Sequence, residues 1–80
     1  MRVLIADDHD LLRDTLVEYL QSQGGFEVDC AGDLDTALAL VESSARFDLI
    51  LLDLKMPGMD GLNGLTRMLG ARGGQRVALM

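Results

Sequence analysis

Residues 49–61 of this 80-residue chain read LILLDLKMPGMDG, an apolar run that ends in Asp53 and opens into a loop containing Pro57 and two glycines. A short apolar run bounded by turn residues is typical of a buried strand. Because Leu49–Leu52 is apolar on both faces, it indicates a central strand of a parallel sheet covered by helices on both sides. This stretch therefore places the carboxylate of Asp53 at the carboxyl end of a central strand.

The same pattern occurs near the N-terminus, where residues 3–6 (VLIA) are followed by Asp7 and Asp8. If the two runs are neighbouring parallel strands, three carboxylates meet at one edge of the sheet, which is where open α/β sheets bind ligands. Three acids packed together need a hard cation, and Mg²⁺ prefers oxygen ligands. The sequence therefore predicts a Mg²⁺ site formed by Asp7, Asp8 and Asp53.

The rest of the chain alternates between strand and helix patterns. We expect strands at residues 2–6, 26–31, 49–52 and 77–80. We expect helices at residues 10–23, from an N-cap at Asp33 to about residues 44–46, and from an N-cap at Asp60 to the glycines at 70, 73 and 74. This alternation predicts an α/β fold with a doubly wound parallel sheet, made of three strand–helix units and one further strand.

Each helix is expected to bury one apolar stripe. The stripes are Leu12, Leu16, Tyr19 and Leu20 in the first helix, Leu34, Ala37, Leu38 and Val41 in the second, and Leu62, Leu65 and Leu69 in the third. Cys30 in the second strand is expected to be a small buried apolar residue. His9 is expected to cap the first helix or to lie at the rim of the acidic site.

Composition excludes several classes of protein. The formal net charge is −6 and no segment is rich in Lys or Arg, so direct binding to nucleic acid is not expected. A single cysteine allows no internal disulfide, and no apolar run is long enough to cross a membrane. These features predict a cytoplasmic protein that neither spans nor binds a membrane.

Several motifs together resemble the acidic pocket of response-regulator receiver domains, the phosphoacceptor half of two-component signalling. They are Asp7-Asp8 after the first strand, Asp53 after the third, and Met56-Pro57 with Asp60-Gly61 behind it. The order of the elements extends the resemblance over the whole chain. The stretch Ala6-Asp7-Asp8-His9 followed by Leu11-Leu12-Arg13 also resembles the subgroup of regulators with a LuxR/NarL-type helix-turn-helix output domain.

The resemblance implies a flavodoxin-like fold and a role for each acid. Asp53 would accept a phosphoryl group from a phosphohistidine of a sensor histidine kinase. Asp7, Asp8, Asp53 and the backbone carbonyl of Lys55 would hold Mg²⁺. Such a chain is a self-phosphorylating acceptor that can catalyse its own dephosphorylation, and it is not a turnover enzyme on a separate substrate.

The chain departs from the family pattern after its fourth strand. Receivers have five strand–helix units, so residues 1–80 are expected to be an incomplete receiver domain that lacks the fourth helix, fifth strand and fifth helix. A Ser or Thr after the fourth strand and a Lys after the fifth are also absent. We therefore expect Mg²⁺ binding with poor phosphorylation and an impaired switch. The open edge of the fourth strand predicts a homodimer or an exchange of elements between copies.

Two other functions remain open at this point. The first is a non-phosphorylated dimerisation or partner-docking module with a vestigial acidic pocket. The second is an aspartyl-phosphate phosphatase, but that family typically has another acid two residues after its nucleophile, where this chain has Lys55.

Overall fold

The structure is a computed structural model that describes residues 1–43 and 46–80. Its strands are β1 (Arg2–Ala6), β2 (Glu27–Ala31), β3 (Leu49–Leu52) and β4 (Val77–Leu79), and its helices are α1 (Asp10–Gln23), α2 (Leu34–Glu42) and α3 (Leu62–Ala71). All seven predicted elements are present in the expected order. The expected end of the second helix falls partly on residues 44 and 45, which lie outside the described residues, and α2 itself ends at Glu42.

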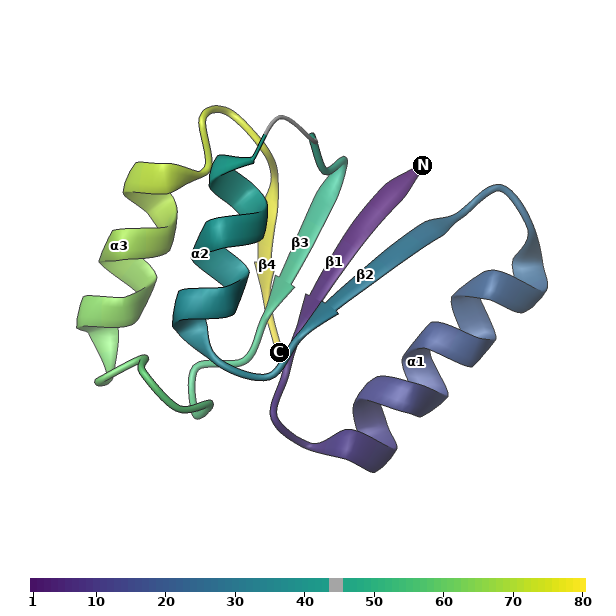
Figure 1. The fold of residues 1–80 in the computed structure, drawn as a ribbon, viewed down its shortest axis with the longest axis horizontal. Helices are drawn as coiled ribbons and strands as arrows, with labels where there is room; N and C mark the ends of the chain where they lie inside the picture. Colours follow the sequence, from purple (N-terminus) through teal and green to yellow (C-terminus); the bar gives the residue numbers. More distant parts are fainter. Residues whose placement is uncertain (44–45) are drawn as a thin grey trace.

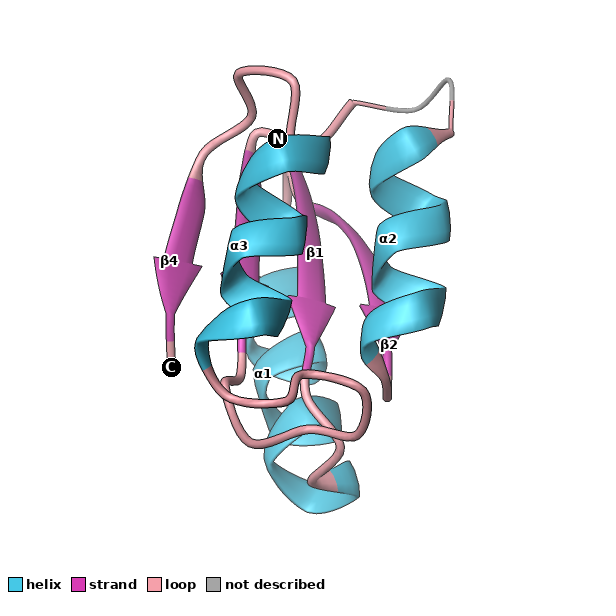
Figure 2. Cartoon of the chain, turned by 90° about the vertical axis from the view of Figure 1, so that its left-hand side faces the viewer, coloured by secondary structure: helices cyan, strands magenta, loops and turns pink. Residues whose placement is uncertain are grey.

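The four strands form one parallel sheet in the order β2-β1-β3-β4. All four arrowheads point to the same end of the sheet (Figure 1). Helices α2 and α3 cover one face and α1 lies against the other (Figure 2). The predicted doubly wound, flavodoxin-like sheet is confirmed, and β3 is a central strand as its apolar sequence indicates.

The main core lies between the sheet and the pair α2 and α3. Alternate residues of β1 and β3 point into it, including Leu4 and Ile50, which are fully buried. The apolar stripe of α2 faces them as expected, with Leu34 and Ala37 also fully buried. Asp33 caps α2, since its carboxylate accepts a hydrogen bond from the Thr36 N–H over 2.7 Å. No helix in the described ranges is long and apolar enough to span a bilayer.

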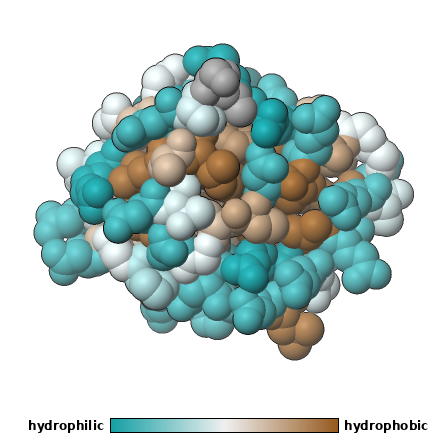
Figure 3. All heavy atoms as spheres, in the orientation of Figure 1, coloured by the Kyte–Doolittle hydropathy of each residue, from teal (hydrophilic) through white to brown (hydrophobic). Residues whose placement is uncertain are grey.

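The prediction of a buried stripe on α1 is wrong. No residue of α1 is buried, and Leu12 and Tyr19 are 47% and 61% exposed. Within the described chain α1 is alone on its face of the sheet, so no neighbouring helix covers its flanks (Figure 2). Apolar side chains reach the surface among polar ones in the space-filling view (Figure 3).

The third helix and the second strand correct three further predictions. In α3 the buried residues are Gly64 and Met68, because the helix packs Gly64 against the preceding loop. Of the predicted stripe, Leu65 is half-buried against the core, while Leu62 is 72% exposed. The N-cap of α3 is Gly61 and not Asp60. Cys30 is exposed, because it lies on the edge strand β2, opposite Ile5 and on the face that α1 alone covers.

Candidate functional site

The sheet brings the predicted acids together at the carboxyl ends of β1 and β3. Ala6 pairs with Leu52 in the register of these strands, so Asp7 and Asp53 follow at the same level. The backbone continues the ladder, since the Asp53 N–H donates to the Ala6 carbonyl over 2.9 Å. Ligand atoms from Asp7, Asp8, His9 and Asp53 all lie within 4.8 Å of one another. The predicted convergence of the three aspartates is confirmed.

The three carboxylates differ in burial. Asp7 is 1% exposed and Asp53 is 8% exposed, whereas Asp8 lies at the surface. The Asp53 Oδ1 atom accepts the Lys55 N–H over 2.9 Å, but its Oδ2 atom is buried without a hydrogen-bond partner. An unpartnered buried carboxylate oxygen is costly, and a cation beside it would remove that cost. The donor set of carboxylate oxygens therefore fits a hard divalent ion such as Mg²⁺.

His9 turns its ring toward these carboxylates. Its backbone N–H lies 2.9 Å, and its Nδ1 atom 2.8 Å, from the Oδ1 atom of Asp7. The same Nδ1 atom lies 3.3 Å from Oδ1 of Asp8 and 3.5 Å from Oδ2 of Asp53. His9 occupies the N-cap position of α1, but its side chain makes no capping hydrogen bond. It is therefore part of the acidic cluster, beyond the capping or rim role expected from the sequence.

These contacts perturb two ionisable groups. Burial acts to raise the pKa of Asp7, but the hydrogen bonds from the His9 backbone N–H and ring outweigh it, so this pKa lies below its ordinary value. The hydrogen bond to Asp7 and the negative charge of Asp8 raise the pKa of His9 above its ordinary value. The cluster thus attracts positive charge.

Arg13 supports the loop that carries Asp7 and Asp8. Its Nη1 atom donates to the Asp7 carbonyl over 3.1 Å, and its Nη2 atom donates to the Asp10 carboxylate over 2.8 Å. The guanidinium therefore ties the first turn of α1 to the end of β1. Sequence reasoning gave Arg13 no role in the site, although its place one turn into the helix after the aspartates was a usable signal.

The loop after Asp53 is packed against the protein. Met56 and Met59 are buried, and the Pro57 carbonyl accepts the Leu34 N–H over 3.0 Å. At Gly58 the backbone has φ +89°, and an added Cβ would make a tight contact of 3.2 Å with the Leu34 Cβ, so both conformation and space favour glycine there. The side chain of Lys55 is exposed, and the role of its carbonyl as a metal ligand stays a prediction.

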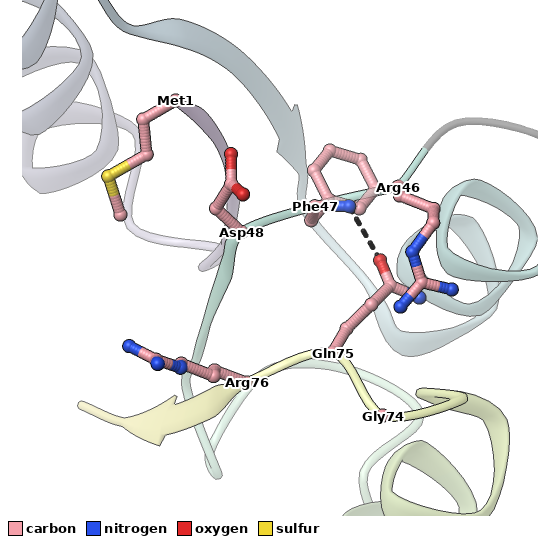
Figure 4. A pocket seen from close by; sticks show the side chains of 7 residues that line it. All are labelled: Met1, Arg46, Phe47, Asp48, Gly74, Gln75 and Arg76. Carbon is pink, nitrogen blue, oxygen red and sulfur yellow. Dashed lines mark hydrogen bonds between the residues drawn. The ribbon is translucent and has the colours of Figure 1, made fainter.

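A hollow lies away from the aspartates, near the opposite ends of the strands, and is lined by residues that include Met1, Phe47, Gln75 and Arg76 (Figure 4). Its buried polar side chain is Gln75, whose Oε1 atom accepts the Phe47 N–H over 2.6 Å. The Gln75 Nε2 atom donates to the Arg72 carbonyl over 2.8 Å. Since both ends of this amide bind backbone groups, we assign Gln75 to holding the loop before β4.

Comparison with known proteins agrees with this geometry. Residues 3–80 match the family described as "Response regulator receiver domain". The glycerol metabolism activator of Pseudomonas putida is 47% identical over 68 residues, which cover 84% of this chain and 31% of that protein. The chain therefore spans about a third of the length of this relative.

Solved structures share the fold over nearly the whole chain. The receiver domain of the hybrid histidine kinase CckA superposes with a TM-score of 0.84 at 34% identity, covering 99% of this chain and 73% of that one. The response regulator TrrA of Thermotoga maritima, solved in complex with Mg²⁺-BeF, gives a TM-score of 0.78 at 32% identity, covering 98% and 66%. The chain belongs to the response-regulator receiver domain family.

Proposed function

We propose that Asp53 is the phosphoacceptor of a two-component response regulator and that a sensor histidine kinase is its phosphoryl donor. The observation that carries this proposal is the position of Asp53. It ends the central strand, is held through Oδ1 by the Lys55 N–H, and keeps a buried, unpartnered Oδ2 beside Asp7 and Asp8. A carboxylate placed in this way can act as a nucleophile once the charge of the phosphoryl group is neutralised.

The chemical step is a phosphoryl transfer. A carboxylate oxygen of Asp53 forms a bond to phosphorus while the bond from phosphorus to the kinase imidazole nitrogen breaks. The imidazole keeps that electron pair and takes a proton from solvent. Hydrolysis of the acyl phosphate by water returns the Asp53 carboxylate and inorganic phosphate, which makes the signal reversible.

Asp7, Asp8, Asp53 and the Lys55 backbone carbonyl would hold Mg²⁺ in this site. The bound ion would supply the positive charge that offsets the charge of the phosphoryl oxygens. The residues of the chain position the acceptor. The sheet ladder fixes Asp7 and Asp53 at one level, and Arg13 holds the loop between β1 and α1 that carries Asp7 and Asp8. Receiver domains as a class are not turnover enzymes, and self-dephosphorylation is the one catalytic activity we assign here.

Several wider assignments belong to the same proposal. Residues 1–80 would form the N-terminal portion of a receiver domain, in a cytoplasmic regulator that acts on transcription. The support is the family match over residues 3–80 and the similarity to an activator protein of Pseudomonas putida. A LuxR/NarL-type output domain stays a prediction from the stretch around His9.

Phosphorylation of Asp53 can be tested with acetyl phosphate and Mg²⁺. Borohydride reduction converts an aspartyl phosphate to homoserine, which mass spectrometry locates in the chain. We expect slow labelling at Asp53 alone, no labelling of Asp53→Asn, and unchanged labelling of the control Asp60→Asn. Equal labelling of wild type and Asp53→Asn would disprove the assignment of the acceptor.

Association of two copies through β4 is a further part of the proposal. Within the described residues β4 is an edge strand with β3 as its neighbour, and Leu79 is 52% exposed. Such edges pair with other strands. We expect a concentration-dependent rise in mass by light scattering. The Met80 N–H donates to the Leu52 carbonyl, so the N–H of the preceding residue, Leu79, faces the open edge. Replacement of Leu79 with proline, which cannot donate to a new ladder, should therefore reduce the association. A constant monomeric mass at high concentration would count against this interface.

A further inference from the structure

The ring of His9 lies inside the cluster that the aspartates form. Its Nδ1 atom is 2.8 Å from Asp7, 3.3 Å from Asp8 and 3.5 Å from Asp53. Two ligands on adjacent positions of an octahedral ion that binds each at about 2.1 Å are about 3 Å apart. The nitrogen is therefore spaced from the three oxygens as a fourth ligand would be.

The position of this ring is set by the backbone as well as by its own hydrogen bond. The His9 backbone N–H donates to the same Asp7 oxygen that the ring contacts. Arg13 donates to the Asp7 carbonyl and to the Asp10 carboxylate, so residues on both sides of His9 are tied together at the end of β1. The backbone at His9 is therefore held in place, and the ring can leave the carboxylates only by rotation of the His9 side chain.

The Asp53 carboxylate gives an independent indication that the cluster is made for a ligand. Asp53 is 8% exposed, and its buried Oδ2 atom, 3.5 Å from the His9 nitrogen, has no hydrogen-bond partner. An oxygen in this state is expected to bind a cation, and an ion bound to it would lie within reach of the His9 ring.

We propose that His9 is a nitrogen ligand of the metal site, which it binds through Nδ1 after the proton shared with Asp7 is released to solvent as the ion enters. His9 thereby shifts the selectivity of the site from Mg²⁺ toward later divalent ions. Carboxylate oxygens suit Mg²⁺ and Mn²⁺, whereas imidazole nitrogen suits Co²⁺, Ni²⁺, Cu²⁺ and Zn²⁺. The ligand set of Asp7, Asp8, Asp53 and His9 should therefore bind most tightly the ions that accept both oxygen and nitrogen ligands. This inference rests on the proposed metal site and adds a residue that determines its specificity.

Electron paramagnetic resonance of the Cu²⁺-loaded chain tests the nitrogen ligand directly. His9 is the one histidine of the sequence, so any imidazole coupling belongs to it. The N-terminal amine cannot reach the cluster, because it donates to the Gly25 carbonyl over 2.7 Å at the other end of the strands. We expect ¹⁴N hyperfine splitting that changes on ¹⁵N-histidine labelling and is lost in His9→Gln. Cu²⁺ bound at the aspartates without this splitting would overturn the inference.

Metal titrations at one fixed pH test selectivity. We expect His9→Gln to weaken Co²⁺ and Ni²⁺ binding by about tenfold or more and to leave Mg²⁺ binding within about twofold, since loss of a donor costs most for the ions that prefer nitrogen. The His9 side chain is 65% exposed, so this variant should fold. Equal effects on all ions, or tighter binding of all ions, would refute the inference. Failure of wild type to bind Mg²⁺ would instead refute the proposed metal site itself.

Discussion

The backbone N–H of Asp53 donates to the carbonyl of Ala6 over 2.9 Å, one step beyond the last pair of the β1–β3 ladder. This bond fixes the level of Asp53 relative to Asp7, the residue after Ala6. The distance between the two buried acids is therefore set by the sheet and not by the loops that follow them. A change in one carboxylate should alter the affinity for a cation without moving the others.

Mg²⁺ should raise the free energy of unfolding of the chain, because the ion binds the folded cluster and not the separated aspartates. At a Mg²⁺ concentration about a hundredfold above the dissociation constant, the expected gain is about 2.7 kcal/mol. Asp8→Asn should move this gain to higher Mg²⁺ concentration with little cost to the metal-free fold, since Asp8 is exposed. Urea unfolding followed by circular dichroism, with and without Mg²⁺, measures both effects.

The matched control is Glu18→Gln, which removes another exposed acid, in helix α1. Glu18 lies outside the group of ligand atoms, so its loss should leave the Mg²⁺ dependence unchanged. If Mg²⁺ stabilises wild type and Asp8→Asn at the same concentrations, Asp8 is not a ligand.

Met68 should contribute far more to stability than Leu62 in the same helix. Met68 is fully buried, so Met68→Ala should cost about 2–5 kcal/mol. Leu62 is 72% exposed, and Leu62→Ala should change stability by no more than about 0.5 kcal/mol. Chemical denaturation of the two variants beside wild type makes the comparison. A larger cost at Leu62 would restore the helical face predicted from the leucine spacing.

The sequence predicted the sheet and the meeting of the acids because those features depend on chain-local signals. The apolar run Leu49–Leu52 has the length and composition of a buried strand, and Asp53 ends it. Once two such strands are parallel neighbours, their carboxyl ends must lie together. The proximity of Asp7 and Asp53 could therefore be predicted without knowledge of the loops or of the packing between helices.

The predictions that failed concern features that are determined by packing between elements. Leucines at 62, 65 and 69 have acceptable helical spacing, yet contact with the Met59 loop selects the face that carries Gly64 and Met68. Burial of Cys30 depends on how much of β2 is covered by α1, and the periodicity of the sequence does not reveal this. The inward turn of His9 is a rotamer choice set by Asp7, and only the proximity of a histidine to an acidic pair could have suggested it.

The cap of α2 should make stability depend on pH through Asp33. The hydrogen bond from the Thr36 N–H lowers the pKa of Asp33 in the folded state. Its stabilising contribution is therefore complete above the pKa of the unfolded chain and is lost as pH falls through the folded pKa. Asp33→Asn keeps an acceptor that does not titrate, so the stability of wild type relative to Asp33→Asn should fall in acid.

The control for this prediction is Asp33→Ala, which removes the acceptor and should be less stable than Asp33→Asn at every pH. Unfolding curves recorded across the acidic range for all three chains give the comparison. A difference between wild type and Asp33→Asn that stays constant as pH falls would show that the carboxylate charge does not contribute.

Gly64 and Gly70 of α3 should respond in opposite directions to the same substitution. A Cβ at Gly64 would overlap the backbone of Met59, whose carbonyl accepts the Gly64 N–H over 2.5 Å, so Gly64→Ala must push the loop behind the acidic site away from the helix. We expect a loss of about 1–3 kcal/mol, as for other overpacked positions.

At Gly70 no atom lies within 4 Å of an added Cβ, and Gly70→Ala should gain about 0.5–1 kcal/mol of stability from the better helix propensity of alanine. Thermal and urea unfolding give both values, and Mg²⁺ titration of Gly64→Ala then reports whether the displaced loop carries Lys55 away from the aspartates. Equal stability of the two variants would mean that the loop yields without cost and that α3 does not hold the site in place.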